Sequence, residues 1–353
     1  MSDDLQSSES ADCFAPLRIA TVGQCPNAVF HLEAAAIREE LIPVAAARTN
    51  DAEGSTVSVP DCSVCDIDEL VERSDVDAVF VCGPVESRID HAVRLLQAGR
   101  HVIVEPSFVL QPEELQQLIN EAEASQKFCE IWRPQNADPD FRRAAKVVSS
   151  GEAGPIRSLR FMQHDMAAAL LPVAAPLMEN VQTSRDRLTT STLRDSAAHR
   201  VAQALTLISA PVKNVSAKDR QDSLVLGERG SVRKVAPKGD TTFHAVIDFE
   251  NDATAIIDIG LACPAPFSTG WIVQGNQGGY HTDRQYITVD DGEIYDVAVE
   301  IEPFDPYLNL GSMLGNWANP KIRKQCLEQL QTELRLANVL QKFFVGQEYR
   351  ADT

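Results

Sequence analysis

The stretch that decides the fold is Asp77–Pro106, DAVFVCGPVESRIDHAVRLLQAGRHVIVEP. The apolar run DAVFV, followed by Gly83 and Pro84, predicts a buried strand and a turn. ESRIDHAVRLLQAG has the spacing of an amphipathic helix ended by a glycine, and HVIV, with three β-branched residues, predicts a second buried strand. Strand, helix and strand in this order form the βαβ unit of a parallel sheet, and its second strand delivers a sharp turn at Glu105-Pro106.

The same alternation continues on both sides of this unit. The flanking segments predict, in chain order, a strand, helix, strand and helix before it and a helix after it: LRIATVG, NAVFHLEAAAIREE, LIPVAAART, IDELVERSD and QPEELQQLINEAEASQ. The sequence therefore predicts an α/β protein whose N-terminal domain, residues 16–133, is a doubly wound parallel sheet of the Rossmann type.

Ligands bind such sheets outside the carboxyl ends of the strands. The segments that follow the predicted strands should therefore face one site, and these are Gly23, Ala47–Asn50, Gly83-Pro84 and Glu105-Pro106.

Residues 134–353 follow a different pattern. A helix over DPDFRRAAKVVSSGEAG precedes extended, partly alternating runs: IRSLRFMQHD, PVKNVSAKD, TTFHAVIDF, ATAIIDIGLA and GWIVQGN. The block KIRKQCLEQLQTELRLANVLQKFFVG predicts helical structure near the end of the chain. We therefore expect a C-terminal α+β domain with a large, mostly antiparallel open sheet, and a domain boundary near Trp132–Pro139.

Composition limits the possible functions. A chain of 353 residues exceeds the usual size of one core, which agrees with two domains. The formal net charge of −19 would repel nucleic acid and anionic membranes, so neither is expected as a partner. No apolar stretch reaches the length of a membrane span, and the polar start MSDDLQSSES lacks the features of a secretory signal. We expect a cytoplasmic protein in which residues 1–15 are disordered.

The cysteines and histidines give no sequence signal for a metal. Eight cysteines are scattered along the chain, and reduced thiols are expected. Cys62 and Cys65 have the spacing of a redox or half-zinc motif, but no second cysteine pair or nearby histidine follows. The carboxylates are too dispersed for a metal cage, and His31, His91 and His244 are interpreted as structural. No metal site is therefore predicted.

Several stretches together resemble one family, the Gfo/Idh/MocA dehydrogenases, named for glucose–fructose oxidoreductase, inositol dehydrogenase and a rhizopine-catabolism protein. Besides Asp77–Pro106, the stretches DPDFRRAAKVVSSGEAGPIRSLRF, DSAAHRVAQALTLISAPVKNVSA and FENDATAIIDIGLA are similar to the family in order and approximate spacing. The resemblance implies a Rossmann domain followed by a domain whose open sheet carries the substrate site. It also implies hydride transfer between a nicotinamide cofactor and a sugar, cyclitol or related hydroxyl, in a homo-oligomer that is a dimer or tetramer.

The chain departs from the family at the turn after HVIV. Family members carry Glu-Lys-Pro where this chain has Glu105-Pro106-Ser107, so the lysine position falls on Pro106. In the family that ammonium stabilises the oxyanion that develops as hydride leaves, and proline offers neither a charge nor an N–H. Loss of such a group typically costs about 10²- to 10³-fold in rate. Two functions stay open: an NAD(P)-dependent dehydrogenase, or a catalytically inactive member that binds a ligand or has a regulatory or assembly role.

The loop GQCPNA departs from the dinucleotide fingerprint as well. Gly23 occupies the first glycine position, Cys25 the second and Ala28 the third, where alanine is tolerated. Cys25 adds a side chain where the pyrophosphate would lie, and Pro26 removes an N–H group from the helix N-terminus. The loop either binds a cofactor or is only a β-to-α connection.

The end of the second strand favours NADP over NAD. Ala47 stands near the position of the acidic residue that binds a ribose 2′-hydroxyl, and it cannot do so. Arg48 and Thr49 follow, and a guanidinium beside a hydroxyl suits a 2′-phosphate. The alternative is that Arg48 is a solvated loop charge. The predicted cofactor-binding residues are Gly23, Cys25, Ala28, Arg48, Thr49, Gly83, Pro84 and Glu105.

The stretch TTSTLRDSAAHRVA resembles the family's glycine-rich run followed by Asp-x-x-x-His. Asp195 and His199 are four residues apart and would share one face of a helix. The resemblance implies that neutral His199 takes the hydroxyl proton while Asp195 contacts substrate or orients the imidazole. Without the resemblance the two would be a helix-surface pair.

Three further residues are predicted to contact a polyol or sugar acid. Arg88 falls where family members often carry a histidine, and Trp132 and Arg133 belong to the segment WRPQN, which is usually richer in asparagine and arginine. The alternative for Trp132 is packing between the domains.

Overall fold

The computed structural model describes residues 15–23, 25–49, 62–106, 111–164, 185–220, 224–228, 231–235, 241–261, 267–288, 294–301, 303 and 305–344. The segment expected to be disordered, 1–15, lies outside this range except for Ala15.

The chain forms two compact units. The first comprises the residues up to Glu105 together with Gln117–Ile131 and Asp305–Leu327, and the second comprises Pro106–Gln116, Trp132–Phe304 and the residues from Glu328 onward. The predicted boundary near residue 133 assigns Asp305–Leu327 to the C-terminal domain, whereas this segment belongs to the first unit.

The first unit contains a parallel sheet in the order β3-β2-β1-β4-β5-β6. Its strands are β1 (Leu17–Val22), β2 (Leu41–Arg48), β3 (Ser63–Asp66), β4 (Ala78–Val81), β5 (His101–Val104) and β6 (Cys129–Ile131). This is the strand order of the Rossmann fold, so the predicted doubly wound sheet is confirmed. Strands β3 and β6 were not predicted because their sequences, SVCD and CEI, lack the apolar run that marks β4 and β5.

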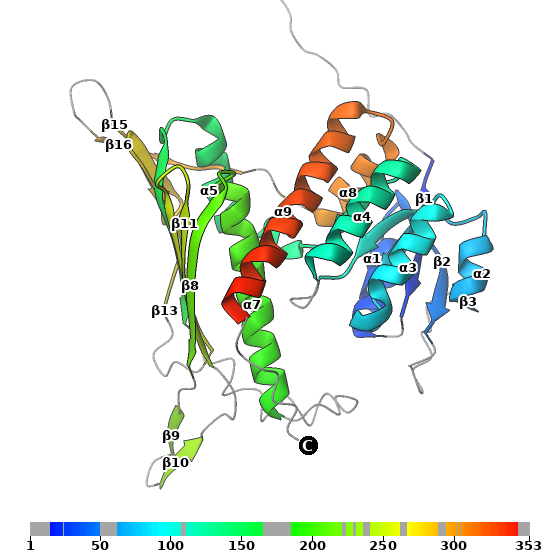
Figure 1. Ribbon diagram of the computed structural model, residues 1–353, viewed down its shortest axis with the longest axis horizontal. Helices are drawn as coiled ribbons and strands as arrows, with labels where there is room; N and C mark the ends of the chain where they lie inside the picture. Colours follow the sequence, from blue (N-terminus) through cyan, green and yellow to red (C-terminus); the bar gives the residue numbers. More distant parts are fainter. Residues whose placement is uncertain are drawn as a thin grey trace, which may run out of the picture. The chain divides into compact units, whose positions relative to one another are not determined.

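Helices connect these strands, as the blue and cyan ribbons of Figure 1 show. They are α1 (Pro26–Ala36), α2 (Ile67–Glu72), α3 (Val85–Gln97) and α4 (Pro112–Ser125), and α8 (Pro306–Gly315) joins them from the far end of the chain. Helix α3 illustrates their origin. Ile89, Ala92, Val93 and Leu96 are buried at helical spacing, and the chain leaves the helix at Gly99 with a φ of +77°.

Helix α8 was not predicted, and its aromatic contacts explain why it joins the first unit. Its Tyr307 is 4% exposed and its ring lies 5.9 Å from that of His31 and 6.1 Å from that of Phe80. The guanidinium of Arg38 lies 4.6 Å from the Tyr307 ring centroid and also binds Asp305. These contacts come from tertiary packing that no local pattern signals.

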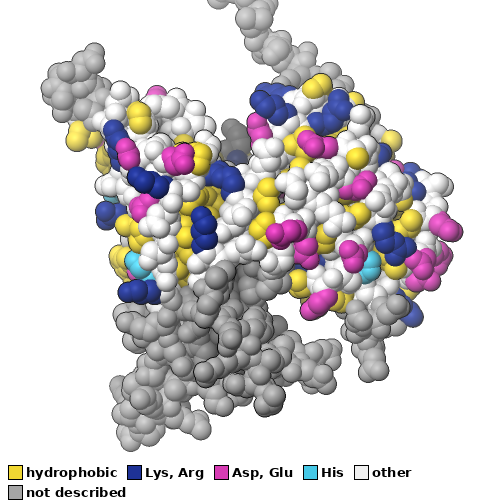
Figure 2. Space-filling model, in the orientation of Figure 1, with side chains coloured by type: hydrophobic (Ala, Val, Ile, Leu, Met, Phe, Trp, Pro, Cys, Tyr) yellow, Lys and Arg dark blue, Asp and Glu magenta, His cyan; other side chains and the backbone are white. Residues whose placement is uncertain are grey.

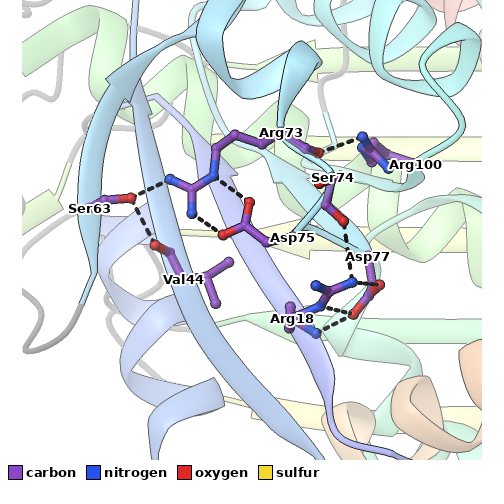
Figure 3. Close-up of polar contacts among 8 residues, drawn as sticks. All are labelled: Arg18, Val44, Ser63, Arg73, Ser74, Asp75, Asp77 and Arg100. Carbon is purple, nitrogen blue, oxygen red and sulfur yellow. Dashed lines mark hydrogen bonds and ion pairs between the residues drawn. The ribbon is translucent and has the colours of Figure 1, made fainter.

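Ion pairs fix the amino ends of the strands (Figure 3). Arg18 at the start of β1 donates to both carboxylate oxygens of Asp77, just before β4, at 2.9 and 2.8 Å. Arg73 donates to Asp75 at 2.8 and 2.6 Å and to the hydroxyl of Ser63 at the start of β3. This polar network holds the end of the sheet opposite the carboxyl edge.

The second unit is built on a mixed sheet in the order β16-β15-β14-β13-β7-β12-β11-β8. All neighbouring strands are antiparallel except β12 and β7, so the predicted mostly antiparallel sheet is confirmed. Its strands are β7 (Ile156–His164), β8 (Val212–Arg220), β11 (Thr242–Phe249), β12 (Thr254–Gly260), β13 (Phe267–Gly275), β14 (Gly278–His281), β15 (Arg284–Thr288) and β16 (Ile294–Ala298), and a separate pair is β9 (Leu224–Glu228) and β10 (Ser231–Val235).

One face of this sheet is covered by helices. Figure 1 shows α5 (Pro139–Ser150) and α7 (Arg185–Leu207) on the same side of it, and α9 (Pro320–Phe344) ends in this unit. A 3₁₀ turn, Pro134–Ala137, precedes α5. Alternate residues of β11 and β12 are buried against α7, which confirms the partly alternating pattern of the sequence. The residues of this core include Phe243, Ala245, Ile247, Ala255, Ile257, Ile259, Ala197, Val201 and Leu205.

Acidic and basic side chains are intermixed over the described surface that Figure 2 shows. Among the described residues, no helix combines the length and the apolar character that crossing a membrane requires.

Replacing Asp77 with asparagine should lower the melting temperature near neutral pH, because Arg18 loses its carboxylate partner. The hydrogen bond from Arg18 lowers the pKa of Asp77 below its ordinary value of 3.8. A carboxyl whose pKa is lower in the folded protein stabilises the fold above the unfolded pKa, and this stabilisation is lost as pH falls through the folded pKa. Melting curves of the wild type and Asp77→Asn between pH 7 and pH 3 should therefore converge at the acid end. Asp75→Asn, whose side chain is 52% exposed against 29% for Asp77, is the control with the smaller effect. Equal melting temperatures for Asp77→Asn and wild type at pH 7 would contradict this role.

Candidate functional site

The turn after β1 approaches the turn after β4 very closely. Gly23 has a φ of +109°, and a Cβ placed on it would lie 2.6 Å from the backbone nitrogen of Gly83. Its N–H donates to the carbonyl of Ala47 at 3.0 Å, which ties the turn to the end of β2. Both the dihedral angle and the contact require glycine at position 23. This is the role of the first glycine in the fingerprint.

Cys25 turns its side chain toward the end of β4. Its thiol donates to the carbonyl oxygen of Cys82 at 3.3 Å. The Cys82 side chain, together with the amide groups of Asn27 and Ala28, lowers the pKa of Cys25 to about 6 against the opposing effect of burial. Burial and Cys25 raise the pKa of the Cys82 thiol well above its ordinary value. Cys25 is thus the N-cap residue of α1, with its sulfur inside the turn.

The rest of the glycine loop is compatible with a dinucleotide-binding turn. Ala28, at the third glycine position, is 0% exposed, so the small side chain allows α1 to pack on the sheet. Pro26 is the first residue of α1, where a helix tolerates the missing N–H. Asn27 follows within the first helical turn. The helix N-terminus therefore keeps fewer free N–H groups for an anion than a loop without proline has.

The end of β2 places Arg48 in solvent and Thr49 in the interior. Arg48 is exposed, whereas Thr49 is 7% exposed, and its methyl carbon lies 3.2 Å from the position that a Cβ on Gly83 would take. Asn50 lies outside the described residues. The exposure of Arg48 is compatible with both interpretations of the sequence, a contact with a 2′-phosphate and a solvated loop charge.

Arg88 joins the turns that follow β4 and β5. Its guanidinium donates to the carbonyl of Gly83 at 3.1 and 2.9 Å and to the carbonyl of Glu105 at 2.9 Å, and the residue is 8% exposed. Pro84 is the N-cap residue of α3 in this turn. These contacts describe a residue that holds backbone in place, and the predicted contact of Arg88 with a substrate stays a prediction.

Glu105 directs its carboxylate into the interior of the first unit. Its Oε1 lies 2.5 Å from Nε2 of His31, and Nδ1 of the same ring lies 2.7 Å from the hydroxyl of Tyr307. The ring of His31 stacks on Phe80 with centroids 4.0 Å apart. His31 is 1% exposed and Glu105 9%. The sequence analysis did not predict that these residues would be in contact, because they come from α1, the turn after β5 and α8.

In the second unit, Arg133 is the centre of a buried polar cluster. It donates to both oxygens of Glu333 on α9 at 2.8 and 2.6 Å, and its remaining terminal nitrogen lies 2.9 Å from Nδ1 of His199 on α7. The side chains of Arg133 and Glu333 are 3% and 5% exposed. Glu333 was not predicted. Helix α9 carries a second glutamate and several other polar residues, and the sequence has no feature that distinguishes the buried glutamate from the exposed one.

The contact with Arg133 determines the state of His199. Arginine can only donate hydrogen bonds, so Nδ1 of His199 is the acceptor and the ring proton is on Nε2. Burial, followed by the charges of Arg133 and Arg200, lowers the pKa of His199 to about 3. The imidazole is therefore neutral at neutral pH.

Two other predicted residues lie close to this cluster in the chain. Asp195 is on α7 four residues before His199, as expected, but its side chain lies outside the described residues. Trp132 is 6% exposed and directly precedes Arg133. Their predicted contacts with substrate stay predictions.

Comparison with known families identifies the chain. A model described as an oxidoreductase family with an NAD-binding Rossmann fold matches residues 17–131, and a model of the GFO/IDH/MocA C-terminal domain matches residues 141–281. The chain belongs to the Gfo/Idh/MocA family of oxidoreductases. The resemblance noted in the sequence is thereby confirmed, and the Rossmann domain of a Gfo/Idh/MocA protein supports a nicotinamide cofactor.

Individual relatives are distant. The scyllo-inositol 2-dehydrogenase (NADP(+)) IolW of Bacillus subtilis is 24% identical over 207 residues, 58% of this chain and 52% of that protein. An uncharacterized oxidoreductase of Schizosaccharomyces pombe is 29% identical over 147 residues, 40% of each chain. The chain thus spans about half or less of the length of these curated relatives.

Solved structures share the fold across nearly the whole chain. An NAD-binding protein from Listeria innocua has a TM-score of 0.65 at 17% identity, covering 94% of this chain and 97% of that one. GenD2 from gentamicin A biosynthesis, solved in complex with NAD, has a TM-score of 0.62 at 18% identity, covering 94% and 93%. At these identities the likeness establishes the Gfo/Idh/MocA fold alone.

Glu333→Gln should destabilise the protein by about 3 kcal/mol, because it leaves the buried charge of Arg133 without its counterion. Replacing both members, as in Arg133→Met with Glu333→Leu, should recover much of that loss, since apolar side chains can replace a buried ion pair. Chemical denaturation of the single and double variants measures the difference. Glu300→Gln, at an exposed position of the same unit, is the control. A loss for Glu333→Gln no larger than that for Glu300→Gln would contradict the assigned role.

Proposed function

We propose that this Gfo/Idh/MocA protein is a nicotinamide-dependent dehydrogenase that acts on a sugar, cyclitol or related hydroxyl, with NADP as the preferred cofactor. The observation that carries the proposal is the turn between β1 and α1. Gly23 keeps its left-handed conformation against Gly83, Ala28 is buried, and the sulfur of Cys25 points toward β4 instead of into the space before α1. The substitution that seemed to obstruct the diphosphate position therefore supports the turn from within.

The residues of this turn fit a dinucleotide incompletely. The positive end of α1 remains available to a diphosphate, but Pro26 has no N–H, and the N–H of Ala28 already donates to the Cys25 carbonyl at 3.0 Å. We therefore expect weaker cofactor binding than a loop with three glycines provides. The exposed guanidinium of Arg48 would add a charge-assisted contact to a 2′-phosphate, which favours NADP. The name of the B. subtilis relative, which specifies an inositol and NADP, supports the same substrate class and cofactor.

His199 would act on the substrate oxygen as a hydrogen-bond donor. A bound nicotinamide supplies or accepts the hydride in this chemistry. Because Arg133 occupies Nδ1, the neutral imidazole offers Nε2–H, and this group can stabilise negative charge that develops on a carbonyl oxygen during reduction. To take a proton from an alcohol, His199 would have to release Arg133 from Nδ1. A pKa of about 3 also makes the ring a weak base at neutral pH.

NADPH should bind with saturable enhancement of its fluorescence, and NADH should bind more weakly. Arg48→Ala should remove this preference by weakening NADPH alone, because only the 2′-phosphate contact is lost. Arg94→Ala, at a partly exposed arginine of α3 that pairs with Asp68, is the control. No binding of either cofactor at millimolar concentration would refute the dehydrogenase proposal, whereas equal weakening of both by Arg48→Ala would refute only the NADP assignment.

Pro106→Lys should raise turnover of polyols such as scyllo-inositol with NADP by about 10²-fold, because it places an ammonium at the position that the family fills with lysine. Pro106→Ala, which removes the proline without adding charge, should not do so. Adding His199→Ala to the lysine variant should abolish the gain. If cofactor binds but Pro106→Lys stays inactive on a panel of polyols and sugars, the protein is the inactive family member instead.

A further inference from the structure

Three potential metal ligands meet beneath the turn between β1 and α1. The imidazole of His31, the thiol of Cys82 and the carboxylate of Glu105 each offer a ligand atom, and these atoms all lie within 4.8 Å of one another. The residues come from α1, the end of β4 and the end of β5, so they are 51 and 23 residues apart in the sequence. Among the described residues this is the cluster of histidine, cysteine and carboxylate side chains whose geometry suits a metal ion.

The cluster is buried and its histidine is oriented from behind. His31 is 1% exposed, Cys82 4% and Glu105 9%. The Tyr307 hydroxyl holds Nδ1 at 2.7 Å and Phe80 stacks on the ring, so Nε2 is the nitrogen that faces Glu105. Histidines that ligate metals are characteristically held in this way, with the second ring nitrogen bound to an outer partner.

Cys25 is the candidate for a fourth ligand. Its thiol lies 3.3 Å from the Cys82 carbonyl oxygen, outside the group formed by the other three ligand atoms. Its position at the start of α1 directs the sulfur inward toward β4. Two thiols, an imidazole and a carboxylate form a donor set that zinc binds in tetrahedral geometry.

We propose that Cys25, His31, Cys82 and Glu105 bind a zinc ion that fastens the turn between β1 and α1 to the ends of β4 and β5. Zinc bonds of about 2.0–2.3 Å in tetrahedral geometry place ligand atoms roughly 3.3–3.8 Å apart, so the donors of His31, Cys82 and Glu105 need to move by about an ångström, and the Cys25 thiol has to approach them. Two thiolates and a carboxylate carry three negative charges, which the zinc ion and the nearby guanidinium of Arg88 balance.

Zinc binding changes the proton positions in the cluster. Each thiol loses its proton to solvent as its sulfur bonds to zinc. The proton between His31 Nε2 and Glu105 moves to Nδ1, which then donates to the Tyr307 oxygen. The site is structural, with all four ligands from the protein, and it goes beyond the proposed function because it does not depend on cofactor binding.

Metal analysis of the full-length protein tests the proposal. Protein purified without chelator, or reconstituted with Zn²⁺ under reducing conditions, should contain one zinc per chain, and Co²⁺ should give the intense visible absorption of a tetrahedral thiolate site. Cys82→Ser and His31→Gln should each weaken Zn²⁺ affinity by more than about 100-fold, measured by competition with a chromogenic chelator. Cys65 is a buried thiol in β3 of the same sheet, and Cys65→Ser should leave Zn²⁺ affinity unchanged. This control would show that the zinc is not bound by Cys62 and Cys65.

Circular dichroism shows whether a variant that loses zinc is still folded. NADPH titration shows whether the zinc result is separate from the proposed dehydrogenase function. Serine is nearly isosteric with cysteine, so Cys82→Ser should retain the secondary structure of the wild type. Absence of stoichiometric zinc in the reconstituted wild type, or zinc retained equally by Cys82→Ser and His31→Gln, would overturn the proposal. Zinc binding without NADPH binding would support this site while refuting the dehydrogenase, and NADPH binding without zinc would do the reverse.

Discussion

The contact between Gly23 and Gly83 is the constraint on which the carboxyl edge of the first unit depends. A Cβ at position 23 would meet the backbone of the neighbouring turn at 2.6 Å, so the two turns can approach only because position 23 has no side chain. This approach brings Cys25 beside Cys82 and sets the first turn of α1 over the end of β4. Arg88 then ties the Gly83 carbonyl to that of Glu105, which fixes the third turn of the edge.

The polar side chains near this edge are engaged in the interior of the first unit. Pro106 leaves no ammonium at the turn after β5, while Glu105 before it is engaged with His31 in the interior. In the second unit, Arg133 is paired with Glu333, and burial, followed by the charges of Arg133 and Arg200, keeps the neighbouring His199 neutral.

The sequence predicted the parallel sheet well because each long element carries its own pattern. Buried strands such as β4 and β5 are short apolar runs bounded by turn residues, and α3 shows helical spacing that ends at a glycine. The clusters within the units could not be predicted in the same way. His31, Glu105 and Tyr307 are far apart in the chain, and a histidine in a helix or a glutamate before a proline carries no local sign of its partner.

The effect of Cys25 shows why a local motif cannot decide function at this site. In the linear sequence, a side chain at the second glycine position obstructs the diphosphate. The actual direction of that side chain depends on what lies under the turn, and there the Cys25 thiol donates to the carbonyl oxygen of Cys82. The side chain therefore adds a contact to the fold instead of removing space from a ligand.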